Sequence, residues 1–287
     1  MLNVALALVM FGIALELRID DFKQLFNKPK PIFTGIFSQF ILLPALTFWL
    51  VWIIKPLPSV AMGMFMVAAC PGGNVSNFIT HLAKGNTALS VSLTAFATLL
   101  AVGMTPLNLH LWGGLYAPTA QILKEVTLST WQMVKLVSLL LGLPLILGIG
   151  VNRKNPKLAK KMGKYFKIGS LMLFVLLVFL ALYNNRSVFM DYVLYVFWIV
   201  VLHNLLAFCA GFSLARFVGL SQKNVRSITI ETGIQNSGLG LLLIFSFFDG
   251  LGGMAILAAF WGVWHLVSGL ILAGFWGYKP IKTENLA

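Results

Sequence analysis

The stretch ETGIQNSG, residues 231–238, interrupts a run of apolar residues that extends from 228 to 248. It brings Glu231, Gln235 and Asn236 into this hydrophobic run, together with two glycines. An ionisable side chain inside a membrane-spanning helix costs at least ~2.5 kcal/mol, so it marks a functional site by default. The stretch therefore decides the fold and the function together, provided that the chain crosses a membrane.

The composition predicts a membrane protein. Of 287 residues, 59% are hydrophobic and only 10% are charged, whereas soluble domains carry about 25% charged residues. Apolar runs of about 20 residues recur along the chain, which is the length that a helix needs to cross a bilayer, and the strict alternation of barrel strands is absent. We therefore expect an all-α polytopic membrane protein without a soluble domain.

The pattern predicts nine transmembrane helices, near residues 2–18, 31–54, 58–83, 86–108, 131–151, 167–184, 191–217, 226–248 and 252–277. With the N-terminus outside, seventeen of the 21 Lys and Arg residues fall on the inner side. The outer side receives only three, Lys55, Lys124 and Arg186. This asymmetry predicts a multi-pass protein of the cell membrane with a cytoplasmic C-terminus, and it attributes the net charge of +13 to the bilayer rather than to nucleic acid.

The third helix contains CPGGNVSN, residues 70–77. Pro71 lacks a backbone donor, while Gly72 and Gly73 permit non-helical conformations, so the helix should unwind and restart near Val75. The eighth helix should break in the same way near 231–238. Backbone groups freed at this depth must be buried in protein or line a wet cavity.

The two broken helices suggest inverted repeats, in which the first four helices correspond to the last four. The first repeat would cover residues 1–108, with its break near 71–77, and the second 131–287. Residues 109–130 would form an extracellular linker, and the basic segment 152–167 an inner loop. In such folds the half-helix ends meet at an ion and substrate site, and we expect positive ends near Gly73 and Gly233.

Glu231 requires a counter-charge. The other seven acidic residues lie at helix ends, in loops or in the tail, and no Lys or Arg within a span is an obvious partner. Oxygen ligands for a bound cation are available from Ser76 and Asn77, and from Ser90 and Thr94, which share one helix face. A set of carboxylate, amide and hydroxyl oxygens suits a hard cation such as Na+.

Three segments, CPGGNVSN, ALSVSLT (88–94) and ETGIQNSG, resemble the signature segments of the bile acid:sodium symporter family, and the resemblance runs from the first helix to the last. It implies an inverted-repeat bundle in which a core domain holds two crossed, discontinuous helices and a panel domain moves against it. It also implies two sodium ions. The implied ligands are Ser76, Asn77, Ser90, Thr94 and Glu231 for one ion, and Gln39, Glu231, Gln235 and the carbonyls of Thr232 and Ile234 for the other. The implied substrate-cavity residues are Asn74, Asn236 and His265.

Two features depart from the family pattern. The chain begins where the second helix of ten-helix bacterial members begins, so it resembles either the nine-helix animal members or a ten-helix member without its first helix. Leu266 stands where an Asn is expected, and Asn74 stands where a Thr is frequent. Both changes lie on the expected substrate wall and weaken the case for bile acid as the cargo.

The expected function is sodium-coupled import of an organic anion, either bile-acid-like or a smaller carboxylate, with no obligate protein partner. A proton-coupled carboxylate transporter, with Glu231 as the proton carrier, is the alternative. An intramembrane enzyme would need paired carboxylates, a Ser/His pair or a metal cluster, and here one carboxylate stands alone. A receptor or channel would not accumulate solute against a gradient.

Overall fold

The computed structural model describes residues 2–17, 29–125, 130–184 and 186–278, and all regular structure in these ranges is helical. The helices, in chain order, are α1 (Leu2–Ala14), α3 (Pro29–Phe37), the π-helical turn η1 (Ser38–Leu42), α4 (Leu43–Ile54), α5 (Pro58–Ala69), α6 (Val75–Leu82), α7 (Thr87–Leu115), α8 (Ala117–Glu125), α9 (Thr130–Lys154), α10 (Pro156–Asn184), α11 (Arg186–Phe217), α12 (Gln222–Gly233), α13 (Ser237–Phe247) and α14 (Gly252–Tyr278).

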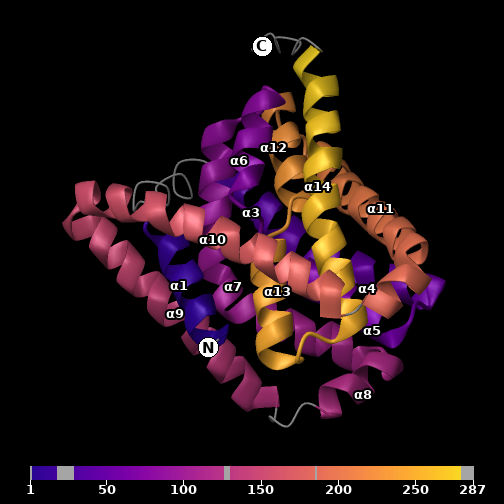
Figure 1. Ribbon diagram of the computed structural model, residues 1–287. Coiled ribbons are helices and arrows are strands. Elements are labelled where there is room, and N and C mark those ends of the chain that lie inside the picture. The colour runs from indigo at the N-terminus through magenta and orange to yellow at the C-terminus, as the bar shows by residue number, and fades with distance from the viewer. Residues whose placement is uncertain (1, 18–28, 126–129, 185, 279–287) are drawn as a thin grey trace.

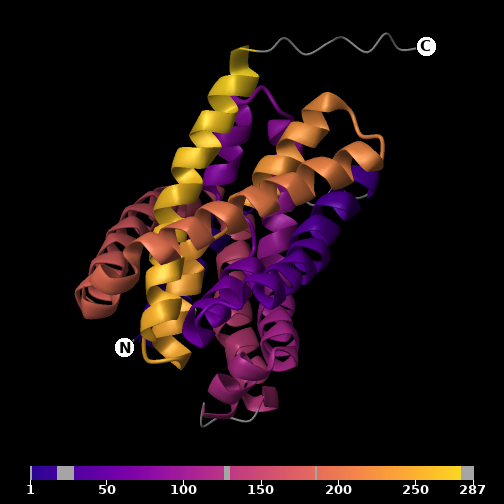
Figure 2. The ribbon, with the colours of Figure 1, turned by 90° about the vertical axis from the view of Figure 1, so that its right-hand side faces the viewer.

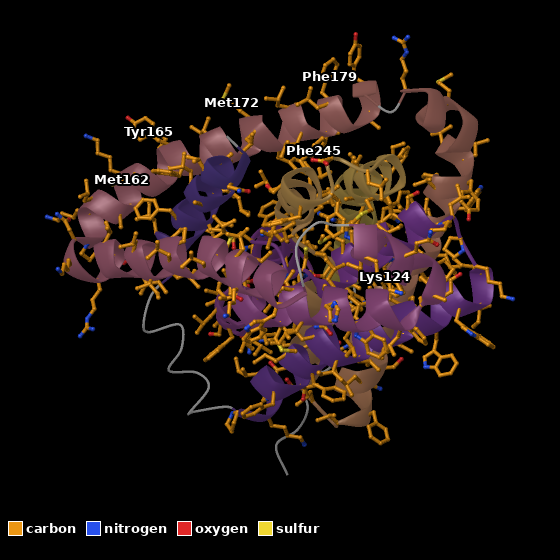
Figure 3. The ribbon with its side chains drawn as sticks, turned by 90° about the horizontal axis from the view of Figure 1, so that it is seen from below. Lys124, Met162, Tyr165, Met172, Phe179 and Phe245 are labelled. Carbon is orange, nitrogen blue, oxygen red and sulfur yellow. The ribbon has the colours of Figure 1, made fainter. Side chains whose placement is uncertain are left out.

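The apolar helices confirm the predicted class of all-α polytopic membrane protein. Six continuous helical segments are long and apolar enough to cross a membrane, and three shorter apolar helices lie in α1, α5 and α13. Along α10, the side chains of Tyr165, Met172 and Phe179 point away from the bundle (Figure 3) and are 60–69% exposed. Apolar side chains on an outer face are expected where lipid replaces water as the surrounding solvent.

Two predicted boundaries are wrong. Helix α7 continues to Leu115 instead of ending at 108, and α8 follows, so the segment 109–130 is largely helical where the structure describes it. The basic segment 152–167 is not a loop, because α9 ends at Lys154 and α10 begins at Pro156. The Asn155 Oδ1 accepts a hydrogen bond from the Leu158 N–H at 3.0 Å. An Asn cap followed by Pro starts the new helix immediately, and the lysines beyond it are good helix formers.

Helix α7 tolerates an internal proline because another helix replaces the lost hydrogen bond. Pro106 has no N–H to donate to the carbonyl of Val102, four residues earlier. The hydroxyl of Ser138 in α9 donates to that carbonyl at 2.7 Å. Such repair by a neighbouring side chain is what permits proline inside transmembrane helices.

The π-turn η1 has a similar origin, and it positions a polar residue of the site. Pro44 cannot donate to the carbonyl of Phe40, which instead accepts a hydrogen bond from the Asn108 side chain at 3.0 Å. The chain widens to an i→i+5 bond between the Leu43 N–H and the Ser38 carbonyl. Gln39 lies in this turn and is buried. Single π-turns within helices frequently accompany functional sites.

The helices form two groups around the broken segments. Helices α1, α9 and α10 pack against one another, with α1 and α9 at one side of the molecule and α10 crossing the front (Figure 1). Helix α11 lies at the opposite side and faces the viewer in Figure 2. Between them, α14 packs along α5 and α13 over a large apolar core that includes Met62, Leu241 and Trp261. The breaks between α5 and α6 and between α12 and α13 are thereby placed inside the protein.

Candidate functional site

Both predicted helix breaks are present, and their backbones pair with each other. The break after α5 lies antiparallel to the break after α12 and is joined to it by an isolated β-bridge. The Gly73 N–H donates to the Ile234 carbonyl at 3.0 Å, and the Asn236 N–H donates to the Pro71 carbonyl at 2.8 Å. Each break therefore satisfies backbone groups that the other leaves free, which is required for non-helical backbone within a membrane protein.

The second positive helix end lies elsewhere than predicted. Gly233 is the last residue of α12, so it belongs to the negative, carboxyl-terminal end of that helix. The amino-terminal end that follows the break belongs to α13, where the Asn236 Oδ1 accepts from the Leu239 N–H at 3.0 Å. Gly73 lies directly before Asn74, the N-cap of α6, as expected. The predicted position is three residues before the N-cap of α13, Asn236, because α12 extends into the ETGIQNSG motif and ends at Gly233.

Glu231 is completely buried in the last turn of α12. Its Oε2 accepts from the Ser76 hydroxyl at 2.5 Å and from the Ser90 hydroxyl at 2.9 Å, and its Oε1 accepts from the Thr94 hydroxyl at 2.7 Å. The Thr94 hydroxyl also lies 3.3 Å from the Asn77 Oδ1. The structure thus brings together all five residues expected around the first ion.

The side chains around Glu231 retain both the negative charge and the free lone pairs that a bound cation needs. The three donors are neutral hydroxyls, which offset none of the carboxylate charge. A hydroxyl has one hydrogen and two lone pairs, so each can donate to Glu231 and still offer a lone pair to a cation. Hard cations prefer such oxygen ligands. The donor set therefore fits Na+ better than it fits an isolated buried carboxylate.

The residues expected around the second ion also meet, on the main-chain side of Glu231. The Gln39 Nε2 donates to the Glu231 carbonyl at 3.0 Å, and the Gln235 Nε2 donates to the Thr232 carbonyl at 2.7 Å. The Oε1 atoms of both glutamines are buried without a hydrogen-bond partner. Buried polar atoms without partners are rare and need an explanation. A cation would supply the partner that both amide oxygens lack.

Sequence reasoning missed two close neighbours of this cluster. Gly72 was predicted only as a helix breaker, yet a Cβ atom on it would lie 2.5 Å from the Glu231 Oε1 and 2.7 Å from the Gln39 Nε2. Its backbone therefore passes directly over the carboxylate. The second neighbour is Ser38, whose hydroxyl lies 2.9 Å from that of Thr232. In the sequence, only its position next to Gln39 could have indicated that Ser38 lies near the site.

A cavity of about 240 Å³ adjoins the crossing, between α1, α10 and α14. The three residues expected to contact substrate, Asn74, Asn236 and His265, all line it, as do Gln235 and Leu266. The Nδ1 atom of His265 is buried without a hydrogen-bond partner. The same segment of chain that carries Gln235 thus borders both the ligand cluster around Glu231 and a space that can hold a small solute.

The sequence of the chain is similar to those of known proteins. Residues 3–192 match the sequence profile of the Sodium Bile acid symporter family. The chain is 34% identical over 283 residues to the uncharacterized sodium-dependent transporter YocS of Bacillus subtilis, a match that covers 99% of this chain and 85% of YocS. It is 30% identical over 292 residues to the human ileal sodium/bile acid cotransporter, covering 100% of this chain and 81% of that one. The probable sodium/metabolite cotransporter BASS1 of Arabidopsis thaliana is 31% identical over 274 residues, covering 95% and 66%.

Proposed function

The chain belongs to the Sodium Bile acid symporter family, whose members are sodium-dependent transporters, and we propose that it imports a small organic anion with two sodium ions by alternating access. One observation carries this proposal. A fully buried carboxylate, Glu231, receives three hydroxyl donors at a crossing of two broken helices, beside two amide oxygens without partners. A cation completes this arrangement.

The two ions would share Glu231. The first would bind its carboxylate and the oxygens of Ser76, Asn77, Ser90 and Thr94. The second would bind on the other side, where the Gln39 and Gln235 amides would turn their oxygens towards it. The remaining ligands of this second ion would be Glu231 and the carbonyls of Thr232 and Ile234.

The anion would bind in the cavity, against the amino-terminal ends of α6 and α13 at Asn74 and Asn236, where helix dipoles favour negative charge. His265 would complete the polar wall. Two Na+ and one monovalent anion carry one net positive charge inwards, which the membrane potential drives with about 2.3 kcal/mol per 100 mV. Coupling of this kind would concentrate a scarce solute.

The arrangement of helices supports nine membrane crossings in two inverted repeats. In each half, two helical segments precede a broken helix and one long helix follows it. These are α1, α3–α4, α5/α6 and α7 in the first half, and α10, α11, α12/α13 and α14 in the second. Helix α1 begins near one end of the molecule and α14 ends near the other (Figure 1), as an odd number of crossings requires. We assign the helices from α1 to α7 to the first repeat, those from α9 to α14 to the part of the chain that holds the second repeat, and α8 to an outer linker. Helices α1, α9 and α10 would form a panel that moves against the rest.

Uptake into proteoliposomes tests this function. Labelled carboxylates of different sizes, from a bile salt to a three-carbon acid, are offered with an inward Na+ gradient, with choline in place of Na+, or with a proton gradient. Accumulation should require Na+ and should be lost in Glu231→Gln. Asp249→Asn is the matched control, because Asp249 is exposed between α13 and α14 and its positive φ of 50° suits Asn. Proton-driven accumulation without Na+ would instead identify Glu231 as a proton carrier.

A further inference from the structure

The hydrogen bonds of Asn74 fix which of its polar atoms can face the cavity. Its Nδ2 donates to the Glu16 Oε2 at 3.2 Å. An ionised carboxylate only accepts hydrogen bonds, so the amide must present its nitrogen to Glu16 and not its oxygen. Asn74 lines the cavity whereas Glu16 lies outside the lining. The Oδ1 atom of Asn74 is therefore the one left for a substrate, to which it offers an acceptor.

Asn236 is fixed with the opposite polarity. Its Oδ1 caps α13 by accepting from the Leu239 N–H at 3.0 Å, and a backbone N–H can only donate. The Nδ2 of Asn236 is therefore the atom left for a substrate in the cavity. The cavity wall offers a donor at the amino-terminal end of α13 and an acceptor at Asn74, while apolar side chains such as Val9, Phe174 and Leu266 line much of the remainder.

We infer that the transported anion is a small hydroxycarboxylate, and that Glu16 is a positioning residue that makes Asn74 select its hydroxyl group. This inference rests on the proposed function and narrows its substrate class. The carboxylate would lie at Asn236 and the N-terminus of α13, and the hydroxyl would donate to the Asn74 Oδ1. The volume of about 240 Å³ suits a short carbon skeleton, since pockets for larger, drug-sized ligands occupy about 300–1,000 Å³.

The test must distinguish positioning of Asn74 by Glu16 from a second effect, repulsion of the substrate by the Glu16 charge. As an exposed anion near the cavity, it could simply repel carboxylates. Repulsion acts on the charge of the substrate and would affect an acid and its hydroxylated analogue equally. Positioning acts on the hydroxyl alone. The ratio of uptake rates for a hydroxy acid and the matching acid without the hydroxyl therefore distinguishes the two roles.

The experiment measures sodium-driven uptake of matched pairs, glycolate with acetate, and 2-hydroxybutyrate and 3-hydroxybutyrate with butyrate. The wild-type protein should favour at least one hydroxy acid by about tenfold, because its analogue leaves a polar group of the site unpaired. Glu16→Leu should reduce this ratio to about 1–2, since Asn74 is then free to turn. Glu16→Gln should largely keep it, because the Gln oxygen still accepts the Asn74 Nδ2.

Asn74→Val, which removes the acceptor itself, should abolish the preference in the same way as Glu16→Leu. At saturating anion, the Na+ concentration for half-maximal uptake should not change in the Glu16 variants, since Glu16 neither donates nor accepts a hydrogen bond within the cluster around Glu231. Equal uptake of both members of every pair by the wild type would overturn the inference while leaving sodium coupling intact. A ratio unchanged in Glu16→Leu would overturn the role of Glu16. Uptake that does not depend on Na+ would contradict the proposed function. The ratio of hydroxy-acid uptake to analogue uptake can still be measured in the same vesicles, so the two failures are distinguishable.

Discussion

Replacing Thr94 with valine tests the proposed cation site at one of the three hydroxyls that contact Glu231. Valine keeps the shape of threonine but removes the hydroxyl, which lies 2.7 Å from the Glu231 Oε1 and which, on the proposed function, would also coordinate the first ion. We take the loss of one neutral oxygen ligand of the ion to cost about as much as the loss of a hydrogen bond to a charged group, about 1.5–3 kcal/mol. Since 1.4 kcal/mol corresponds to a factor of ten in affinity, the Na+ concentration for half-maximal uptake should rise about 10- to 100-fold.

A matched control lies one turn away on the same helix. The Thr98 hydroxyl is also buried, but it donates at 2.7 Å to the backbone carbonyl of Thr94 and does not contact Glu231. Thr98→Val should change the half-maximal Na+ concentration less than about twofold, because back-bonding within a helix contributes little. Sodium titrations of uptake are compared for both variants at saturating anion. If Thr94→Val titrates like Thr98→Val, the Thr94 hydroxyl is not a ligand of the ion, which contradicts the proposed site.

Two further substitutions test the crossing and the helix packing. Gly72→Ala should abolish sodium-driven uptake, because its methyl group would lie 2.5 Å from the Glu231 Oε1; Gly103→Ala, with open space around the added atom, should leave uptake unchanged. Both are measured in proteoliposomes after size-exclusion chromatography has shown folded protein, and normal sodium dependence in Gly72→Ala would contradict the close approach. Ser138→Ala should lower the melting temperature without changing the half-maximal Na+ concentration, since the Val102 carbonyl loses its donor. The loss should be about 0.6–1.7 kcal/mol, and an unchanged melting temperature would show that water replaces the hydroxyl.

Much of the fold could be predicted because the bilayer restricts it so strongly. Apolar length and the residues Pro71 and Gly73 located the helices and the first break, with α6 starting at Val75 as expected. The two wrong helix boundaries fell where the bilayer imposes no rule. Outside the hydrocarbon core a helix can continue or stop, and only local capping decides, as Asn155 does between α9 and α10. Hydropathy carries no signal for that choice.

The sequence pattern alone predicted several residues of the candidate site, but not which of them contact one another. Glu231 is conspicuous because buried charge is costly, and the spacing of Ser90 and Thr94 placed both on one face, where both now donate to it. No spacing rule connects Gln39 to this cluster, because a π-turn reorients it; only family resemblance named it. The contact between Glu16 and Asn74 joins residues 58 positions apart and depends on how α1 packs. Neither local pattern nor resemblance could have found it.

The short break between α12 and α13 gives a physical reason why ion and anion binding should be coupled. Gln235 contributes an unpartnered oxygen to the group beside Glu231, and it also lines the cavity. The next residue, Asn236, is held between the Pro71 carbonyl and the cap of α13. On the proposed function, a cation that turns the Gln235 amide fixes the backbone on which Asn236 meets the anion. Linkage then requires the converse, so the anion must raise the affinity for Na+ by the same factor.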